Sequence, residues 1–284
     1  MDFHILNISD THGGNRHGLM SPDTVLTTEG AEGKPFTFTP EMTPYQEWMW
    51  QDVYLWGIEQ AIKMTAGRPV IVIHAGDVTH GNRFTESLVS SRMSHQIAIA
   101  VRALAELNRV KPVRFFLVHG TDVHVFGEGT AEEEVAERLR GVMGCEVAAT
   151  PFGLLDIGGV KVDIAHHGPG PGVGWLQGNT ARNYAKQHMM DEIFKLHRLP
   201  PDIYIRGHNH AYRYERVELD DGIVSHLILC PSFCSMNGYA RAVTRSIPWI
   251  TNGMVLIDIQ GGMVTDVHPL TKTIDIREHF KVTI

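Results

Sequence analysis

Aspartate and histidine residues recur directly after short apolar stretches of this sequence. The groups are Asp10-Thr11-His12, Gly76-Asp77, Thr121-Asp122-Val123-His124, His166-His167 and His208-Asn209-His210. Carboxylate and imidazole side chains together suit zinc, manganese, iron, cobalt or nickel, and the lack of thiolates in these groups disfavours a structural zinc site. The residue types therefore predict metal-dependent chemistry, provided that the fold brings the groups together.

The apolar stretches indicate the strands that would position these groups. They are Phe3–Ile8, Val70–Ile73, Val113–Val118, Val160–Ala165, Ile203–Ile205, Ile223–Leu229 and Met254–Ile259. Continuous apolar runs of this length are typical of strands that are buried on both faces. The carboxyl ends of strands in an open α/β sheet line one crevice, so residues far apart in the sequence can share a site.

Segments with helical spacing lie between several of these strands. They are Pro44–Thr65, Thr85–Asn108, Ala131–Arg140 and Thr180–His197. Strand and helix alternate through the first two thirds of the chain, whereas the part after Gly207 shows strand signals joined by turns. The pattern predicts an α/β (α+β) fold in a single domain, 1–284, in which 211–284 is mainly β. We expect 13–43 and Gly168–Gly178 to be loops at the rim of the site.

The residue groups resemble the motifs of the calcineurin-like metallophosphoesterases. That family has Asp-x-His, Gly-Asp, Gly-Asn-His, a lone His and Gly-His-x-His in this order, and four of the five elements match between residues 5 and 210. The stretches Tyr45-Gln46-Glu47-Trp48-Met49-Trp50 and Gly120-Thr121-Asp122-Val123-His124 are most similar to uncharacterised phage and prophage members. The resemblance implies a four-layer sandwich of two mixed β-sheets flanked by helices.

The resemblance also implies two divalent metal ions (Mn, Zn, Fe, Co or Ni) and their ligands. Asp10, His12 and His210 would hold one ion, Asp77 would bridge, and His166 and His208 would hold the other. We take His166 rather than His167 as the ligand because it comes first in the pair. The ions would supply a bridging hydroxide for attack on phosphorus.

The third motif departs from the family pattern. Where the family has Asn and then His, this chain has Thr121 and then Asp122, and His124 follows two positions later. Asp122 could replace the Asn as an oxygen ligand, and His124 could protonate the leaving group, with His80 or His167 as substitutes. The alternative is that this segment has lost its catalytic role.

Four further side chains are candidates for contact with the substrate: Arg16, His17, His80 and His167. Arg16 and His17 follow the first motif and could bind the phosphate, or they could lie at the surface. His80 could instead support the metal ligands or cap the next helix.

Composition limits the function classes. The chain has 284 residues, a formal net charge of -7 and three cysteines without paired metal spacing. The acidic balance disfavours nonspecific nucleic-acid binding, and the cysteine usage fits a reducing compartment. With neither a signal-peptide pattern nor a long apolar run, we expect a cytoplasmic protein without a membrane anchor.

Together these observations predict a two-metal phosphodiesterase or phosphomonoesterase that acts on a small or nucleotide-like phosphate ester. A DNA nuclease of the same fold is one alternative. A non-catalytic interaction module that has kept the fold is the other. The sequence leaves the native metals, the substrate and the oligomeric state open.

Overall fold

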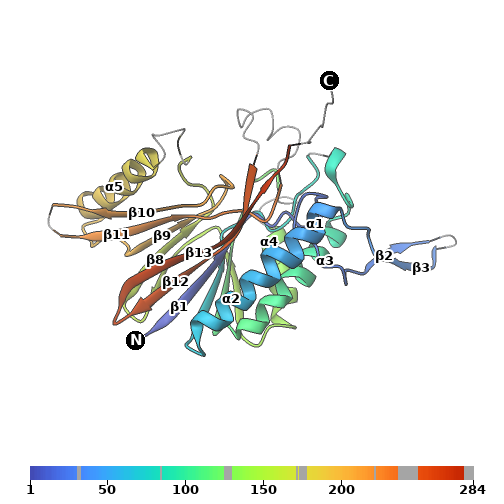
Figure 1. Ribbon diagram of the computed structural model, residues 1–284, viewed down its shortest axis with the longest axis horizontal. Coiled ribbons are helices and arrows are strands. Elements are labelled where there is room, and N and C mark those ends of the chain that lie inside the picture. Colours follow the sequence, from blue (N-terminus) through green and yellow to red (C-terminus); the bar gives the residue numbers. More distant parts are fainter. Residues whose placement is uncertain are drawn as a thin grey trace, which may run out of the picture.

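Strands and helices are mixed along the chain and form two large β-sheets with helices packed against them (Figure 1). The computed structural model describes residues 1–30, 33–83, 85–124, 130–170, 172, 178–220, 222–235 and 249–277. The prediction of a mixed α/β fold is therefore confirmed. No helix within these residues has both the length and the apolarity needed to cross a lipid bilayer.

The first sheet has six strands in the order β13-β12-β1-β4-β5-β6. Their bounds are β1 Phe3–Ile8, β4 Val70–His74, β5 Arg114–Val118, β6 Glu146–Thr150, β12 Trp249–Gln260 and β13 Met263–Asp275. Neighbouring strands from β1 to β6 are parallel, whereas β12 pairs antiparallel with both β1 and β13. β1 and β4 are buried along their whole length, as their continuous apolar sequences predict.

The second sheet has five strands in the order β10-β11-β9-β8-β7. Their bounds are β7 Phe152–Ile157, β8 Val160–Ala165, β9 Ile203–Arg206, β10 Arg213–Glu218 and β11 Val224–Leu229. The three central strands are parallel and the two edge strands are antiparallel to their neighbours. A separate hairpin, β2 Leu26–Glu29 and β3 Pro35–Phe38, projects from the body within the predicted rim segment (Figure 1).

Apolar side chains hold these sheets and helices together. Ile5 and Ile73 of the first sheet lie in the same buried cluster as Ile164 and Ile205 of the second, so the sheets pack face to face. Other clusters pack helices against the opposite face of each sheet. The loops that follow β1 in the first sheet and β9 in the second meet, because the His208 amide donates to Asp10 Oδ2 at 3.1 Å.

The first helical segment begins at Thr43 with a capping box, in which the Thr43 and Gln46 side chains each accept a hydrogen bond from the other residue's amide. The α-helices are α1 Pro44–Trp48, α2 Trp56–Thr65, α3 Met93–Leu104, α4 Thr130–Arg140 and α5 Asn179–Phe194. A π-helical segment, Met49–Leu55, joins α1 to α2, so the predicted helix Pro44–Thr65 is continuous. Short 3-10 turns lie at Thr85–Ser87 and Ala105–Val110.

The structure differs from the sequence prediction at half-exposed elements. The apolar pattern does not predict β2, β3, β6, β7, β10 or β13, because strands such as β7 alternate exposed and half-buried residues. The predicted helix Thr85–Asn108 is interrupted, since Arg92 is extended and α3 starts only at Met93. Most of Gly168–Gly178 lies outside the described residues, and the described part of 211–284 consists mainly of β10 to β13.

Candidate metal centre

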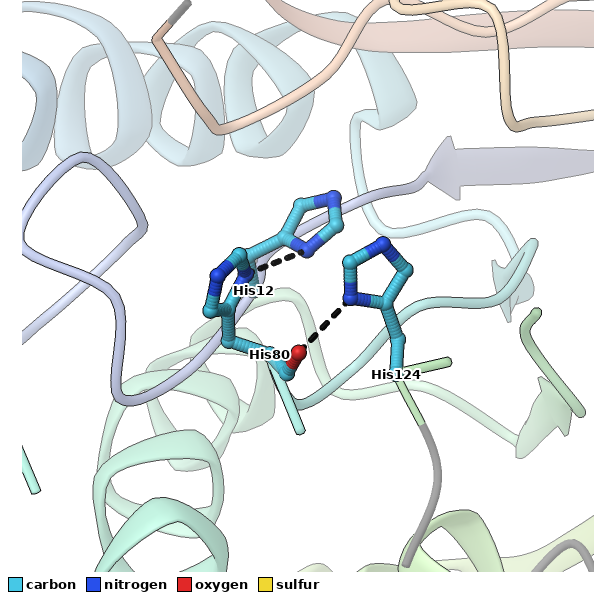
Figure 2. Close-up of side chains that lie close together, drawn as sticks. All are labelled: His12, His80 and His124. Atoms are coloured by element: carbon cyan, nitrogen blue, oxygen red, sulfur yellow. Dashed lines mark hydrogen bonds between the residues drawn. The ribbon is translucent and has the colours of Figure 1, made fainter. Parts of the chain in front are cut away.

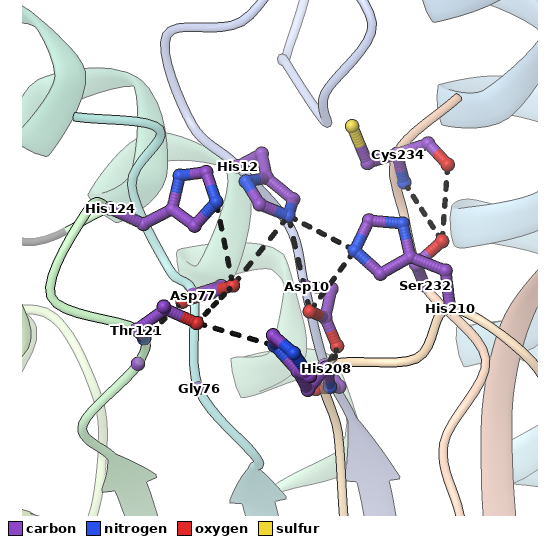
Figure 3. A network of polar contacts seen from close by, with 12 residues as sticks. Asp10, His12, Gly76, Asp77, Thr121, His124, His208, His210, Ser232 and Cys234 are labelled. Carbon is purple, nitrogen blue, oxygen red and sulfur yellow. Dashed lines mark hydrogen bonds and ion pairs between the residues drawn. The ribbon is translucent and has the colours of Figure 1, made fainter. Parts of the chain in front are cut away.

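The predicted metal ligands other than Asp122 lie in the loops that follow β1, β4, β8 and β9, whereas Asp122 and His124 lie in the loop after β5. Figure 3 shows Asp10, His12, Asp77, His124, His208 and His210 facing one another. Side chains from the site loops form groups in which one ligand atom of each residue lies within 4.8 Å of those of the other residues. The groups are Asp10–His12–His210, Asp77–His166–His208 and His12–His80–His124. These clusters of aspartate and histidine could hold metal ions.

The Asp10–His12–His210 cluster joins the two sheets. His210 Nε2 lies 3.2 Å from Asp10 Oδ1 and 3.2 Å from His12 Nε2. The Ser9 hydroxyl and the His208 amide donate to the other oxygen, Asp10 Oδ2, at 2.5 and 3.1 Å. Asp10 Oδ1 is therefore the oxygen that faces the two imidazoles.

Asp77 lies between this cluster and the second one. Its Oδ2 is 3.1 Å from His166 Nε2 and 3.9 Å from His12 Nε2, so it faces ligands of both clusters. The Thr121 amide donates to Asp77 Oδ1 at 2.6 Å, and the Thr121 hydroxyl lies 3.3 Å from His208 Nδ1. A carboxylate that bridged two ions would need a position between two ligand clusters such as this one.

The third cluster consists of three imidazoles (Figure 2). His80 Nδ1 lies 3.3 Å from His12 Nδ1, and the His80 carbonyl accepts a hydrogen bond from His124 Nδ1 at 2.7 Å. His124 Nε2 lies 3.9 Å from Asp77 Oδ2. A neutral imidazole offers one lone pair, so His12 can donate to a metal in only one of the two clusters that share it.

Two buried atoms show that the donor set fits metal ions. In the described part of the chain, Asp10 Oδ1 and His166 Nε2 are buried and have only ion-pair partners, without a hydrogen bond of ordinary geometry. Buried polar atoms are normally satisfied, so these two require an explanation. Asp10 Oδ1 lies 3.2 Å from His210 Nε2, and His166 Nε2 lies 3.1 Å from Asp77 Oδ2. Two atoms at such a separation could both bind one metal ion at about 2.0–2.2 Å.

Two ion pairs, Asp10–His210 and Asp77–His166, shift the pKa values of their members. Burial opposes each shift, yet His210 holds the pKa of Asp10 below its ordinary range and Asp10 raises that of His210. In the same way His166 lowers the pKa of Asp77, and Asp77 raises the pKa of His166 to about 9. The raised pKa values of His166 and His210 favour their protonated forms beside the two carboxylates, and a metal ion that binds there would have to displace those protons.

The pKa values of His12, His80 and His208 are lowered, which favours the neutral, metal-binding form of these three imidazoles. Burial, reinforced by the neighbouring His124, places the pKa of His12 well below its ordinary value and lowers that of His80 to about 4. Burial and the charge of His166 also lower the pKa of His208.

The site loops contain backbone conformations that L-amino acids rarely adopt. Among the described residues, eight non-glycine residues have a positive φ, and five of them are Asp10, His12, Asp77, His208 and His210. Such conformations cost on the order of 1–3 kcal/mol each and concentrate at functional sites. Gly76 and Gly120 permit close approach, because a Cβ would collide with the His166 ring at Gly76 and with the Asp77 carboxylate at Gly120.

The third motif is arranged differently from the sequence interpretation. Asp122 is exposed and lies in none of the three clusters of described residues. A tight turn, in which the His124 amide donates to the Thr121 carbonyl at 2.8 Å, places both end residues in the centre and leaves Asp122 outside it. Thr121, which the sequence did not single out, is the residue that contacts Asp77 and His208.

The four candidates for substrate contact lie in different environments. Arg16 is exposed and lines a groove with Phe38–Pro44 and Val89, and His17 is half-buried. His167 is exposed and its ring centroid lies 4.6 Å from that of His208. His80 differs from these three, because it is only 2% exposed and its ring faces His12.

Two buried residues support the site without having been recognised in the sequence. His74 Nε2 lies 2.9 Å from the Thr11 hydroxyl and its Nδ1 accepts from the Gly76 amide, so it ties the β1 loop to the β4 loop. Glu132 in α4 accepts a hydrogen bond from the Gly120 amide at 3.2 Å, and burial raises its pKa to about 7. Helical spacing could have identified Glu132, because it precedes the buried Val135 by three positions.

No protein-family model matches this chain, and a search of the curated proteins found no match. A Thermotoga maritima protein solved in solution by NMR is 14% identical, with a TM-score of 0.35 over 95% of this chain and 99% of that one. An Aquifex aeolicus protein of unknown function is 18% identical, with a TM-score of 0.30 over 74% of this chain and 81% of that one. Neither similarity is close enough to bear on function.

Proposed function

We propose that this chain is a two-metal phosphoester hydrolase of the calcineurin-like metallophosphoesterase type. The observation that carries the proposal is the position of Asp77, whose carboxylate faces His12 on one side and His166 on the other. The packing of two mixed sheets between helices supports it, because the resemblance implies a four-layer arrangement of this kind.

The charge of the site suits a phosphate ester. When bound, two divalent ions would acidify a water molecule for attack on phosphorus and attract the phosphate oxygens. Asp10 and Asp77 would offset only part of the charge of the ions, because the histidine ligands are neutral. The net positive site would favour an anionic substrate.

His124 is the residue best placed to handle the proton of the leaving group. Its Nδ1 donates to the His80 carbonyl, and its Nε2 lies 3.9 Å from Asp77. The Nε2 atom can therefore hold or deliver a proton beside the reacting groups. The exposed Arg16 and His167 are available to bind the remainder of the substrate.

The experiment is an assay of the metal-loaded protein on an aryl phosphodiester and an aryl phosphomonoester. Protein that has been stripped with a chelator and reloaded with Mn²⁺ should hydrolyse at least one of them, and the stripped protein should hydrolyse neither. Metal content should be measured on the same samples. Failure to bind metal, or equal rates with and without metal, would contradict the proposal.

The same assay separates the two alternatives. A nuclease should lose activity steeply as salt rises, because nucleic-acid binding releases counterions, whereas cleavage of a small ester should change little. Two bound metals without turnover of either ester would favour the non-catalytic interaction module.

A further inference from the structure

One buried residue, His80, contacts both imidazoles that lie beside Asp77. Its ring faces His12 and its backbone carbonyl accepts from His124 (Figure 2). We infer that His80 is a positioning residue that fixes which nitrogen of His12 and which nitrogen of His124 carries the proton. The inference rests on the proposed function, because it concerns how the same metal centre is assembled.

The assignment for His124 follows from the chemistry of its partner. A carbonyl oxygen can only accept, so His124 Nδ1, at 2.7 Å from the His80 carbonyl, carries a hydrogen. In the neutral ring the lone pair is then on Nε2, the nitrogen that lies 3.9 Å from Asp77 Oδ2. The His80 carbonyl thus directs the reactive nitrogen of His124 toward the centre.

The assignment for His12 follows from the direction of its ring. His12 Nε2 faces Asp77 at 3.9 Å and His210 at 3.2 Å, so this is the nitrogen that can bind a metal. A metal bound there would require Nε2 without a proton, and the hydrogen would be on Nδ1. In the metal-free protein the same tautomer leaves Nε2 free to accept from His210 Nε2. His80 Nδ1, at 3.3 Å, is the acceptor for the hydrogen on His12 Nδ1, and the Asn15 Nδ2 amide at 3.1 Å shares the same lone pair. Histidine ligands of metals usually donate their second N–H to such a partner, which sets the orientation of the ring.

His80 can perform this role because its own position is fixed. Gln96 of α3 is fully buried, and its Oε1 accepts from the amides of His80 and Gly81 at 3.1 and 2.9 Å. Its Nε2 donates to the carbonyls of Gly81 and Ser90 at 3.0 and 2.9 Å. Asn15 contacts the His80 ring from the β1 loop. The ring is therefore held before any metal arrives, and its burial keeps substrate away from it.

The first test measures histidine tautomers in the metal-free protein by long-range ¹H–¹⁵N NMR. We expect the proton on Nδ1 for both His12 and His124 in the native sequence. In His80→Leu, which removes the ring acceptor but keeps the carbonyl, His12 should become a mixture of tautomers while His124 is unchanged. In His80→Asn, whose Oδ1 replaces the Nδ1 acceptor, the Nδ1–H form of His12 should return.

The second test measures metal affinity by Co²⁺ titration followed by absorption spectroscopy. His80→Leu should weaken binding by about 10- to 100-fold, the usual cost of losing a partner of a ligand, and His80→Asn should largely restore it. His226→Asn is the matched control, since it removes an imidazole that hydrogen-bonds Tyr214 in the second sheet. The control should bind Co²⁺ as the native chain does.

Three results would overturn the inference. They are a proton on Nε2 of His12 in the native metal-free protein, unchanged tautomers and Co²⁺ affinity in His80→Leu, and a metal equivalent held by His12, His80 and His124 that disappears in His80→Leu. If His80→Leu does not fold, the native tautomers and His80→Asn decide. Because the NMR test uses metal-free protein, its outcome is independent of whether the protein hydrolyses phosphate esters.

Discussion

The metal centre has a buried base and an exposed rim. The base consists of Asp10, His12, Asp77 and His166, which are 0–3% exposed. The rim consists of His208, which is exposed, and His210, whose side chain is 35% exposed. Both parts contain predicted ligands, but only the base is enclosed by the protein core. We infer that packing of the core fixes the positions of the base side chains, whereas the rim side chains are free to change position when a metal or substrate binds.

This difference separates effects on stability from effects on metal binding. A base residue is desolvated, and the loss of its partner leaves a buried charge or an unsatisfied polar atom. His208 at the rim is hydrated in the metal-free protein, so its loss should affect binding alone, whereas loss of His210 would also remove the ion-pair partner of the buried Asp10. Substitutions in the base and at His208 should therefore differ in metal-free stability even where they remove ligands of the same ion.

The largest effect on activity is expected from Asp77→Asn. This change weakens the group that faces both clusters, so we expect at least an approximately 100-fold loss of hydrolysis, beyond what loss of a supporting partner costs. It should also reduce metal content, as measured on the purified protein. Asp266→Asn on β13, where the carboxylate accepts from the neighbouring Val267 amide, is the control. Equal metal content and activity in Asp77→Asn and Asp266→Asn would refute the bridging role.

His166→Ala and His208→Ala compare base and rim within one cluster. Both should weaken metal binding, because both remove an imidazole from Asp77–His166–His208. His166→Ala should also destabilise the metal-free protein, since it leaves the buried Asp77 carboxylate without its nearest ion-pair partner. His208→Ala should change metal-free stability by no more than about 0.5 kcal/mol, as for other surface substitutions. Chemical denaturation with chelator present measures both, and equal destabilisation would remove the distinction.

The stability of the metal-free base should depend on pH in the alkaline range. Asp77 raises the pKa of His166 from 6.5 to about 9. The stabilisation from this raised pKa is complete below the unfolded value near 6.5 and is lost as the pH rises through 9. The difference in unfolding free energy between the native chain and His166→Asn should therefore shrink over this range. A constant difference from pH 6.5 to 9.5 would show that the pair does not titrate in this way.

Glu132 should have a smaller effect on the stability of the protein, and over a lower pH range than His166. Burial raises the pKa of Glu132 from 4.5 to about 7, so the protonated form is favoured in the folded state. Native stability should then decrease as the pH rises from about 4.5 to 7, and Glu132→Gln should lack this decrease. Thermal unfolding at several pH values measures the difference. Parallel pH profiles for the two proteins would contradict the assignment.

The smallest effect is expected from Asp122→Ala. Its side chain is exposed and outside the clusters, so metal content and activity should change by less than about twofold, which corresponds to a fraction of a kcal/mol. Thr121→Val, which removes the hydroxyl near His208, should have the larger effect of the two. Metal loss in Asp122→Ala comparable to that in His208→Ala would restore the ligand role that the sequence suggested.

The sequence was most informative where one physical requirement dominates. Strands such as β1 and β4 are buried on both faces, so their apolar runs mark them, and the ligands follow where those strands end. Strands such as β7 are half-exposed and carry a weak pattern, so they were not predicted. Asp122 was misplaced relative to the clusters because a turn, rather than residue type, decides whether Thr121 or Asp122 faces inward.

The supporting residues could not have been read from the sequence for a related reason. Gln96 contacts the loop at His80, 16 positions away in the sequence, and His74 contacts Thr11, 63 positions away. No local sequence pattern indicates that a glutamine or histidine will be buried and make such contacts. Glu132 is the exception in part, because its helical position relative to Val135 indicates burial. Which atoms it would contact depends on how α4 packs beside the β5 loop.

The most direct test of the proposed metal pair is a crystal structure of Mn²⁺-loaded protein with anomalous scattering at the manganese edge. We expect two anomalous peaks, one beside Asp10, His12 and His210 and the other beside His166 and His208, with the Asp77 carboxylate between them. A single peak, or peaks that do not contact Asp77, would contradict a bridged pair of ions as the basis of the chemistry.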